Sequence, residues 1–154
     1  MQPRQTTPDS VSISLPIIPE VPPPPEIQNP HSEWAAEELI RAFNAGLVPP
    51  SLKDPCVDLR APVSRAEFAG IAVLTFESLS GTRVEVLPGN PFTDTSDIYV
   101  QMAHSEGLMV GISEDLFDPD TILNREQAAT ALTRVFKRWF IPGWAFPEIG
   151  RAHV

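Results

Sequence analysis

Ser-Arg-Ala-Glu at residues 64–67 and Asn-Arg-Glu-Gln at residues 124–127 decide the fold. In each tetrapeptide a cap residue is followed three positions later by Glu or Gln, which is the pattern of a helix capping box. Each tetrapeptide also leads into a stripe of apolar residues at helical spacing. The sequence therefore predicts capped helices over residues 64–80 and 124–139. Their capping residues are Ser64, Glu67, Asn124 and Gln127.

The pattern around the two tetrapeptides also repeats, with a shift of 60 residues from Arg65 to Arg125. Upstream, a Gly-Leu pair ends a shorter helical pattern in each copy, which predicts helices over 33–46 and 97–106. Each unit therefore consists of a helix, a loop and a capped helix. Because such a unit cannot bury its own apolar face, neighbouring units must share a core. We expect this core to include Phe68, Phe76, Phe136 and Trp139.

Two further stretches lie outside these units. Residues 1–30 hold half of the 18 prolines and no aromatic residue, so we expect an extended linker that does not fold alone. Residues 83–87, Arg-Val-Glu-Val-Leu, alternate like a short strand. The expected fold class is nevertheless all-α, built from helix-loop-helix units behind a disordered proline-rich linker.

Composition argues against several classes of partner. The formal net charge is −9 and no basic run is present, which argues against nucleic acid. No apolar run reaches 18 residues, so we expect no membrane insertion. The N-terminus lacks the pattern of a signal peptide, so a secreted protein would need one upstream.

Catalytic and metal sites are also not expected. His31, His104 and Cys56 are not grouped with other residues in the way that acid–base or nucleophilic catalysis needs. Asp115, Asp118 and Asp120 crowd one loop, but the central glycine and the spacing of a calcium loop are missing. We therefore expect no enzyme activity, no metal and no cofactor, and we interpret these aspartates as surface acids that cap helices.

These residues resemble the S-layer homology family. In that family a repeat opens with a tryptophan or an aromatic-x-aspartate element and reaches a Thr-Arg-Ala-Glu-like tetrapeptide at its second helix. Residues 64–67 match that tetrapeptide with serine for threonine, and residues 124–127 match a variant form. The further matches are Trp34-Ala35, Phe92-Thr93-Asp94, Gly111-Ile112 and Phe117-Asp118-Pro119-Asp120.

The resemblance implies a fold and a task. Repeats of this family usually come in threes and pack with pseudo-threefold symmetry around a helical centre. Grooves between them bind secondary cell-wall polymers, often pyruvylated, and so hold surface proteins on the bacterial cell wall. The expected function is non-covalent anchoring outside the cell, for a cargo domain fused upstream. The alternative is a helical repeat module that binds another protein and no glycan.

The resemblance also suggests how the chain is divided. We expect a linker at 1–30, repeats at 31–81 and 91–139, and a connection at 82–90. Residues 140–147 would begin a truncated continuation, because a third repeat is missing. Residues 148–154, Glu-Ile-Gly-Arg-Ala-His-Val, match the translation of a sequencing adapter and are interpreted as an artefact.

Three residues are candidates for ligand binding. Arg65 and Arg125 occupy the first helical position of their units, where we expect them to be exposed. A guanidinium there can bind a carboxylate with two hydrogen bonds, and the positive end of the helix dipole favours an anion. Trp34 can offer a flat face to a sugar ring, although a place in the core or at a repeat interface is the simpler interpretation.

Overall fold

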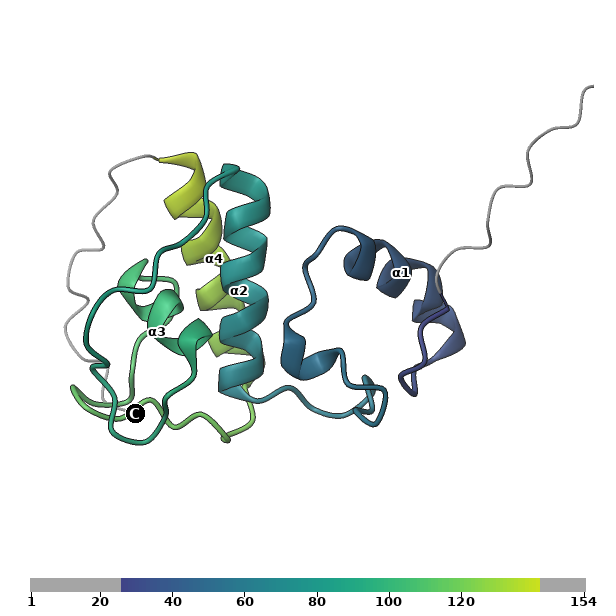
Figure 1. Ribbon diagram of the computed structural model, residues 1–154, viewed down its shortest axis with the longest axis horizontal. Coiled ribbons are helices and arrows are strands. Elements are labelled where there is room, and N and C mark those ends of the chain that lie inside the picture. The colour runs from purple at the N-terminus through teal and green to yellow at the C-terminus, as the bar shows by residue number, and fades with distance from the viewer. Residues whose placement is uncertain (1–25, 142–154) are drawn as a thin grey trace, which may run out of the picture.

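The computed structural model describes residues 26–141, and every regular element in that range is helical. A 3-10 turn at Glu33–Ala35 precedes the first α-helix, which therefore begins about one turn later than predicted. The predicted linker, apart from residues 26–30, and the continuation after residue 141 lie outside the described residues. The all-α prediction is confirmed (Figure 1). The elements are η1 (Glu33–Ala35), α1 (Ala36–Asn44), η2 (Pro50–Leu52), α2 (Arg65–Ser80), α3 (Ile98–Ser105) and α4 (Arg125–Phe140).

The predicted strand at residues 83–87 is wrong, because none of these residues pairs with another strand. The backbone N–H of Val84 instead donates to the Glu77 carboxylate at 2.8 Å, and the Val84 side chain is buried. Its alternating pattern therefore comes from a loop that is fixed to α2 by one carboxylate and one buried valine.

The helix ends of the two units are built in the same way. At α2 and α4, the side chains of Ser64 and Asn124 accept from the N–H three residues later, and Glu67 and Gln127 complete the two capping boxes. At the ends of α1 and α3, the leucine after the glycine donates to the carbonyl five residues back, at 3.0 Å and 2.8 Å. This is the Schellman arrangement. It requires a left-handed glycine, and φ is 71° at Gly46 and 68° at Gly107.

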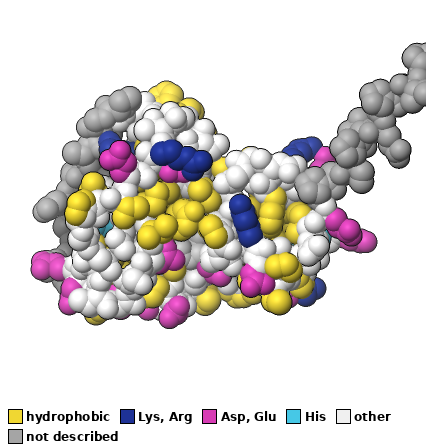
Figure 2. All heavy atoms as spheres, viewed as in Figure 1, with side chains coloured by type: hydrophobic (Ala, Val, Ile, Leu, Met, Phe, Trp, Pro, Cys, Tyr) yellow, Lys and Arg dark blue, Asp and Glu magenta, His cyan; other side chains and the backbone are white. Residues whose placement is uncertain are grey.

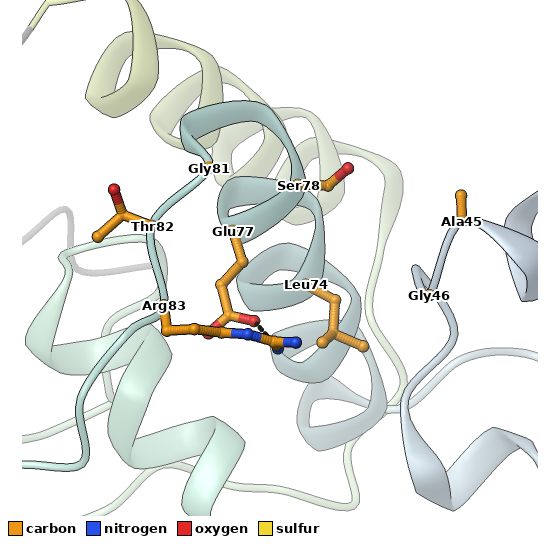
Figure 3. Close-up of a pocket in the computed structure, with 8 residues that line it drawn as sticks. All are labelled: Ala45, Gly46, Leu74, Glu77, Ser78, Gly81, Thr82 and Arg83. Carbon is orange, nitrogen blue, oxygen red and sulfur yellow. Dashed lines mark hydrogen bonds and ion pairs between the residues drawn. The ribbon is translucent and has the colours of Figure 1, made fainter.

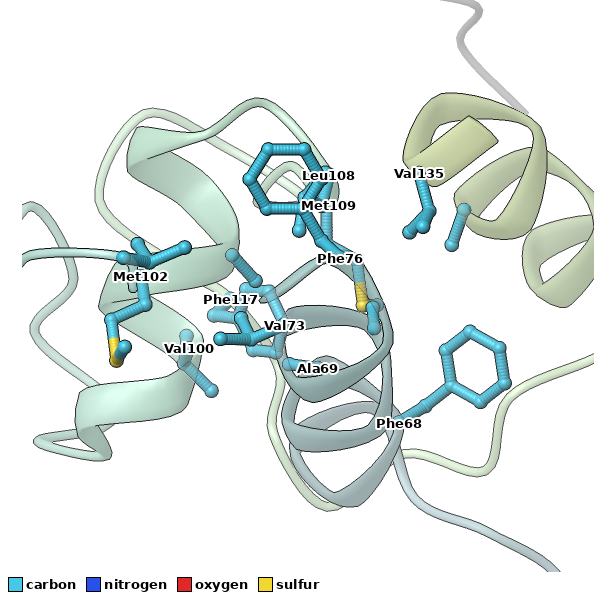
Figure 4. Close-up of a cluster of buried hydrophobic side chains, with 14 of the residues drawn as sticks. Phe68, Ala69, Val73, Phe76, Val100, Met102, Leu108, Met109, Phe117 and Val135 are labelled. Carbon is cyan, nitrogen blue, oxygen red and sulfur yellow. The ribbon is translucent and has the colours of Figure 1, made fainter. Parts of the chain in front are cut away.

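The core lies around α2, which packs against α3 on one side and α4 on the other (Figures 1 and 4). Small residues on α2, such as Ala69 and Ala72, are fully buried and let the neighbouring chain approach closely. Phe68 and Phe76 are buried as predicted. The loop between α3 and α4 completes the core with Leu108, Met109 and Phe117 (Figure 4).

The segment that carries α1 lies to one side of this core (Figure 1). It reaches α2 through Pro49, which is fully buried. A Cβ atom on Gly70 would lie only 2.7 Å from the Cβ of Pro49. Position 70 therefore needs glycine, because any side chain there would push the first segment away from α2.

The prediction that Phe136 and Trp139 are core residues is wrong. Phe136 is 51% exposed and Trp139 is 39% exposed. Helix α4 buries Ala131 and Val135 against α2. No described element covers the part of α4 that carries Phe136, so the equivalent of the buried Phe76 on α2 is open on α4.

This difference in burial predicts that alanine at the equivalent positions 76 and 136 lowers the free energy of unfolding by different amounts. Phe76→Ala should lower the free energy of unfolding by about 3–5 kcal/mol, because it leaves a cavity in the core. Phe136→Ala should cost less than about 1.5 kcal/mol, because half of that side chain already contacts water. Urea unfolding of both variants measures the difference. Equal losses would show that the open face of α4 is covered in solution.

Candidate functional site

The starts of α2 and α4 lie side by side at one end of the molecule. Ser64 and Ile122 form an isolated antiparallel bridge. On either side of it, the N–H of Arg65 donates to Thr121 at 3.0 Å and the N–H of Leu123 donates to Val63 at 3.0 Å. Two helix N-termini, each with a positive partial charge, therefore share one end.

Arg65 is not exposed there, as the sequence led us to expect; only 6% of it is accessible. Its Nε donates to the carbonyl of Phe117 at 3.0 Å and its Nη2 to the carbonyl of Val110 at 2.9 Å. The guanidinium also lies 4.7 Å from the centre of the Phe117 ring. Burial lowers the pKa of Arg65, while the carboxylates of Asp118 and Asp94 act in the opposite direction. Arg65 therefore holds the loop between α3 and α4, and its donors are largely committed.

Arg125 occupies the same helical position and has the opposite environment. Its side chain is exposed. Within residues 26–141 it makes no hydrogen bond or ion pair, since the adjacent capping box uses only Asn124 and Gln127. The guanidinium is thus free to bind a carboxylate beside two helix starts.

Asp94 organises the loop that Arg65 holds. Its carboxylate accepts from the N–H of Phe117 at 3.0 Å and from the N–H of Asp118 at 2.7 Å. These bonds lower the pKa of Asp94, with a smaller contribution from the charge of Arg65. Sequence reasoning missed this role, although the Phe-Thr-Asp opening of the unit was a usable signal. Asn29 does comparable work in the first unit, donating to the carbonyls of Asp54 and Val57.

Trp34 is 87% exposed, so the expectation that it lies in the core is wrong. It lies in η1, next to α1, on the opposite side of the molecule from α4 (Figure 1). The structure therefore does not bring Trp34 together with the two arginines. Any ligand contact that it makes belongs to a separate part of the surface.

Other chemistry finds little support in the described part of the chain. No group of three or more His, Cys, Asp or Glu residues there could hold a metal ion. Cys56 is exposed, and His104 packs edge-on against Phe92 with ring centres 5.0 Å apart. Burial lowers the pKa of His104. None of the described helices has the length and apolar character needed to cross a membrane.

Residues 91–129 match the family model of the S-layer homology domain. The matched segment contains α3, the loop held by Arg65 and Asp94, and the start of α4 with Arg125. No curated protein matches the chain at a significant level.

The two arginines should respond differently to the same substitution. Arg65→Ala should lower the free energy of unfolding by about 2–3 kcal/mol, because it removes charged donors from two loop carbonyls. Arg125→Ala should change it by less than about 0.5 kcal/mol, as an exposed side chain without partners contributes little. Urea unfolding of the two variants is the measurement. A costly Arg125→Ala with a harmless Arg65→Ala would contradict the observed burial.

The Asp94 contacts also predict a dependence on pH. Because the folded state lowers the pKa of Asp94, its contribution is present above the usual aspartate pKa of about 3.9 and is lost as pH falls through the lowered value. Asp94→Asn should therefore be less stable than the native sequence at pH 7. The difference between their free energies of unfolding should become smaller as the pH falls. Urea unfolding of both proteins from pH 7 down into acid tests the claim. A difference in the free energy of unfolding that stays constant with pH would rule out a charged role for Asp94.

Proposed function

We propose that this chain, whose residues 91–129 form an S-layer homology domain, anchors a surface protein by binding an anionic cell-wall polymer. The domain is a non-catalytic anchoring module of the cell surface. The finer part of the proposal is the ligand, a secondary cell-wall polymer or peptidoglycan-linked glycan, with pyruvylated sugars as the candidate, held in grooves between repeats. The protein would work outside the cell, with a cargo domain fused upstream.

The proposal includes a second repeat, at residues 31–81, joined by residues 82–90 to the repeat at 91–139. Two features support it. Both units end their first helix in a Schellman motif and begin their second helix with a capping box. Both also use a polar side chain, Asn29 or Asp94, to bind the backbone of the following loop.

Arg125 is the observation that carries the ligand assignment. It combines an exposed guanidinium, no partner within residues 26–141, and a position beside two helix N-termini. A carboxylate on a sugar could accept two hydrogen bonds there. Arg65 contributes indirectly in this proposal, by holding the loop next to that position.

Electrostatic attraction at long range does not assist this binding. The net charge is −9, and several acidic side chains lie along the lower edge of the face in Figure 2, at the end where α2 begins. At physiological salt, exposed charges are screened beyond about 8 Å. An anionic polymer must therefore be held by short contacts at Arg125, with Trp34 as a separate platform for a sugar ring.

The proposal predicts a binding defect without a folding defect. Arg125→Ala should weaken binding to purified cell-wall sacculi roughly 10- to 150-fold, which corresponds to losing about 1.5–3 kcal/mol of charged hydrogen bonding. Arg125→Lys should recover part of the affinity, since lysine lacks the bidentate fork. Trp34→Ala should weaken binding less. Pull-downs with sacculi, together with thermal melts of each variant, provide the measurement.

The matched control is Arg41→Ala, which removes another exposed arginine, one that pairs with Glu37 and Glu38 on α1. It should bind sacculi like the native sequence. Sacculi from which the secondary polymer has been extracted should no longer bind the chain. The polymer assignment would be rejected if the native chain bound stripped sacculi as tightly as intact ones, or if the Arg125→Ala variant bound intact sacculi as tightly as the native chain. Failure of the native chain to bind any sacculi would favour the alternative, a module that binds another protein.

A further inference from the structure

Helix α4 leaves open a face that is closed on α2. Counted from the first residue of each helix, three residues of α4 correspond to three residues of α2, namely Ala129, Thr133 and Phe136 to Ala69, Val73 and Phe76. The three on α2 are buried in the core, whereas the three on α4 are exposed. The Thr133 hydroxyl donates to the carbonyl of Ala129 at 2.8 Å, so this face can be buried without leaving that donor unpaired. We call Ala129, Thr133 and Phe136 the α4 face.

Helix α1 carries a face of the complementary kind. Counted back from the Gly-Leu pair that ends each first helix, three residues of the α1 segment correspond to three of the α3 segment, namely Leu39, Ala42 and Leu47 to Val100, Ala103 and Leu108. The three in the α3 segment are fully buried. Their counterparts are only partly buried, and α1 itself has no buried residue. We call Leu39, Ala42 and Leu47 the α1 face.

The contact between α2 and α3 shows how two such faces fit together. Val100 and Ala103 of α3 belong to one buried cluster with Ala69 and Val73 of α2 (Figure 4). An alanine on each helix lets the two backbones approach, and the larger residues fill the space around them. The α1 and α4 faces have the same composition, with an alanine and larger side chains on each. They do not meet within one molecule, because α1 lies across α2 from α4 (Figure 1).

Charge also favours contact between an α1 face and an α4 face. Residues 33–44 carry three acidic residues and one basic residue, which gives a net charge of −2. Helix α4 carries four basic residues and one acidic residue, which gives +3 in a chain whose total is −9. Two α4 helices would therefore repel each other, whereas α4 attracts the α1 segment.

We propose that the α4 face of one molecule binds the α1 face of a second copy, as α2 binds α3 within the chain. The contact joins two different faces, so it forms closed pairs or open rows of copies. A contact between two short helices falls below the roughly 1,200–2,000 Å² of a stable interface, so it is weak. At the low concentrations used for urea unfolding, the α4 face is therefore open.

This self-association does not depend on the proposed function. The α4 face begins one turn after Arg125. The loop that follows α1 stays on its own α2, because Pro49 packs against Gly70 there. The second copy therefore brings no loop over Arg125, which remains open to an anionic group.

The test is sedimentation velocity of the full chain at increasing concentration. The native chain should change from a monomer to larger species. Phe136→Asp should raise the dissociation constant at least about tenfold, because it places a charge in the contact that also repels the acidic α1 segment. Leu39→Lys should do the same from the other side. Val86→Asp is the matched control, since Val86 is 50% exposed and Phe136 is 51% exposed, and it should leave the dissociation constant unchanged.

A mixture of the two variants tests which faces meet. Phe136→Asp keeps an intact α1 face and Leu39→Lys keeps an intact α4 face, so an equimolar mixture should associate although neither variant does so alone. The result does not depend on whether Leu39→Lys preserves the fold of its own α1, because the mixture uses only the α4 face of that variant.

Four results would overturn the proposal. A native chain that stays monomeric at the highest concentration would show that something other than a second copy covers the α4 face. Association of Leu39→Lys by itself would show that the α1 face is not used. A mixture that stays monomeric would exclude contact between the two faces, and an equal loss in Val86→Asp would show that the association is unspecific.

Discussion

The structure depends on one buried charge. The Arg65 guanidinium is buried away from solvent at the start of α2. This burial is tolerated because the carbonyls of Val110 and Phe117 accept its hydrogen bonds. Burying a charge without such partners would be prohibitive. The same contact fixes the loop after α3 at Val110 and Phe117, and Asp94 holds that loop through the N–H groups of Phe117 and Asp118. The S-layer homology domain is thereby joined to the helix that precedes it in the chain.

The two ends of the molecule follow from this arrangement. At one end the capped starts of α2 and α4 are held together by the bridge between Ser64 and Ile122, and Arg125 is left free. At the other end, Glu77 binds Arg83 beside a hollow between the end of α1 and the last turns of α2 (Figure 3). In the anchoring proposal, the end with Arg125 binds the anionic group of the polymer.

Local sequence signals predicted the helices well because caps and glycine stops act within a few residues. The boxes at residues 64–67 and 124–127 and the turns at Gly46 and Gly107 all formed. The failures required knowledge of distant neighbours. Arg65 is buried by a loop about 50 residues away, Phe136 is exposed because no described element covers α4, and residues 83–87 lack a partner strand. The hollow likewise joins α1 to α2, and no local pattern encodes it.

Native-state hydrogen exchange tests the central claim, that the Arg65 contact joins the S-layer homology domain to α2, most directly. The measurement compares the amide of Phe117, in the loop that Arg65 holds, with the amide of Val73 in the middle of α2. We expect both to exchange with a similar free energy of opening, and so to belong to one cooperative unit. A Phe117 amide that exchanges through a far cheaper local opening than Val73 would contradict this account.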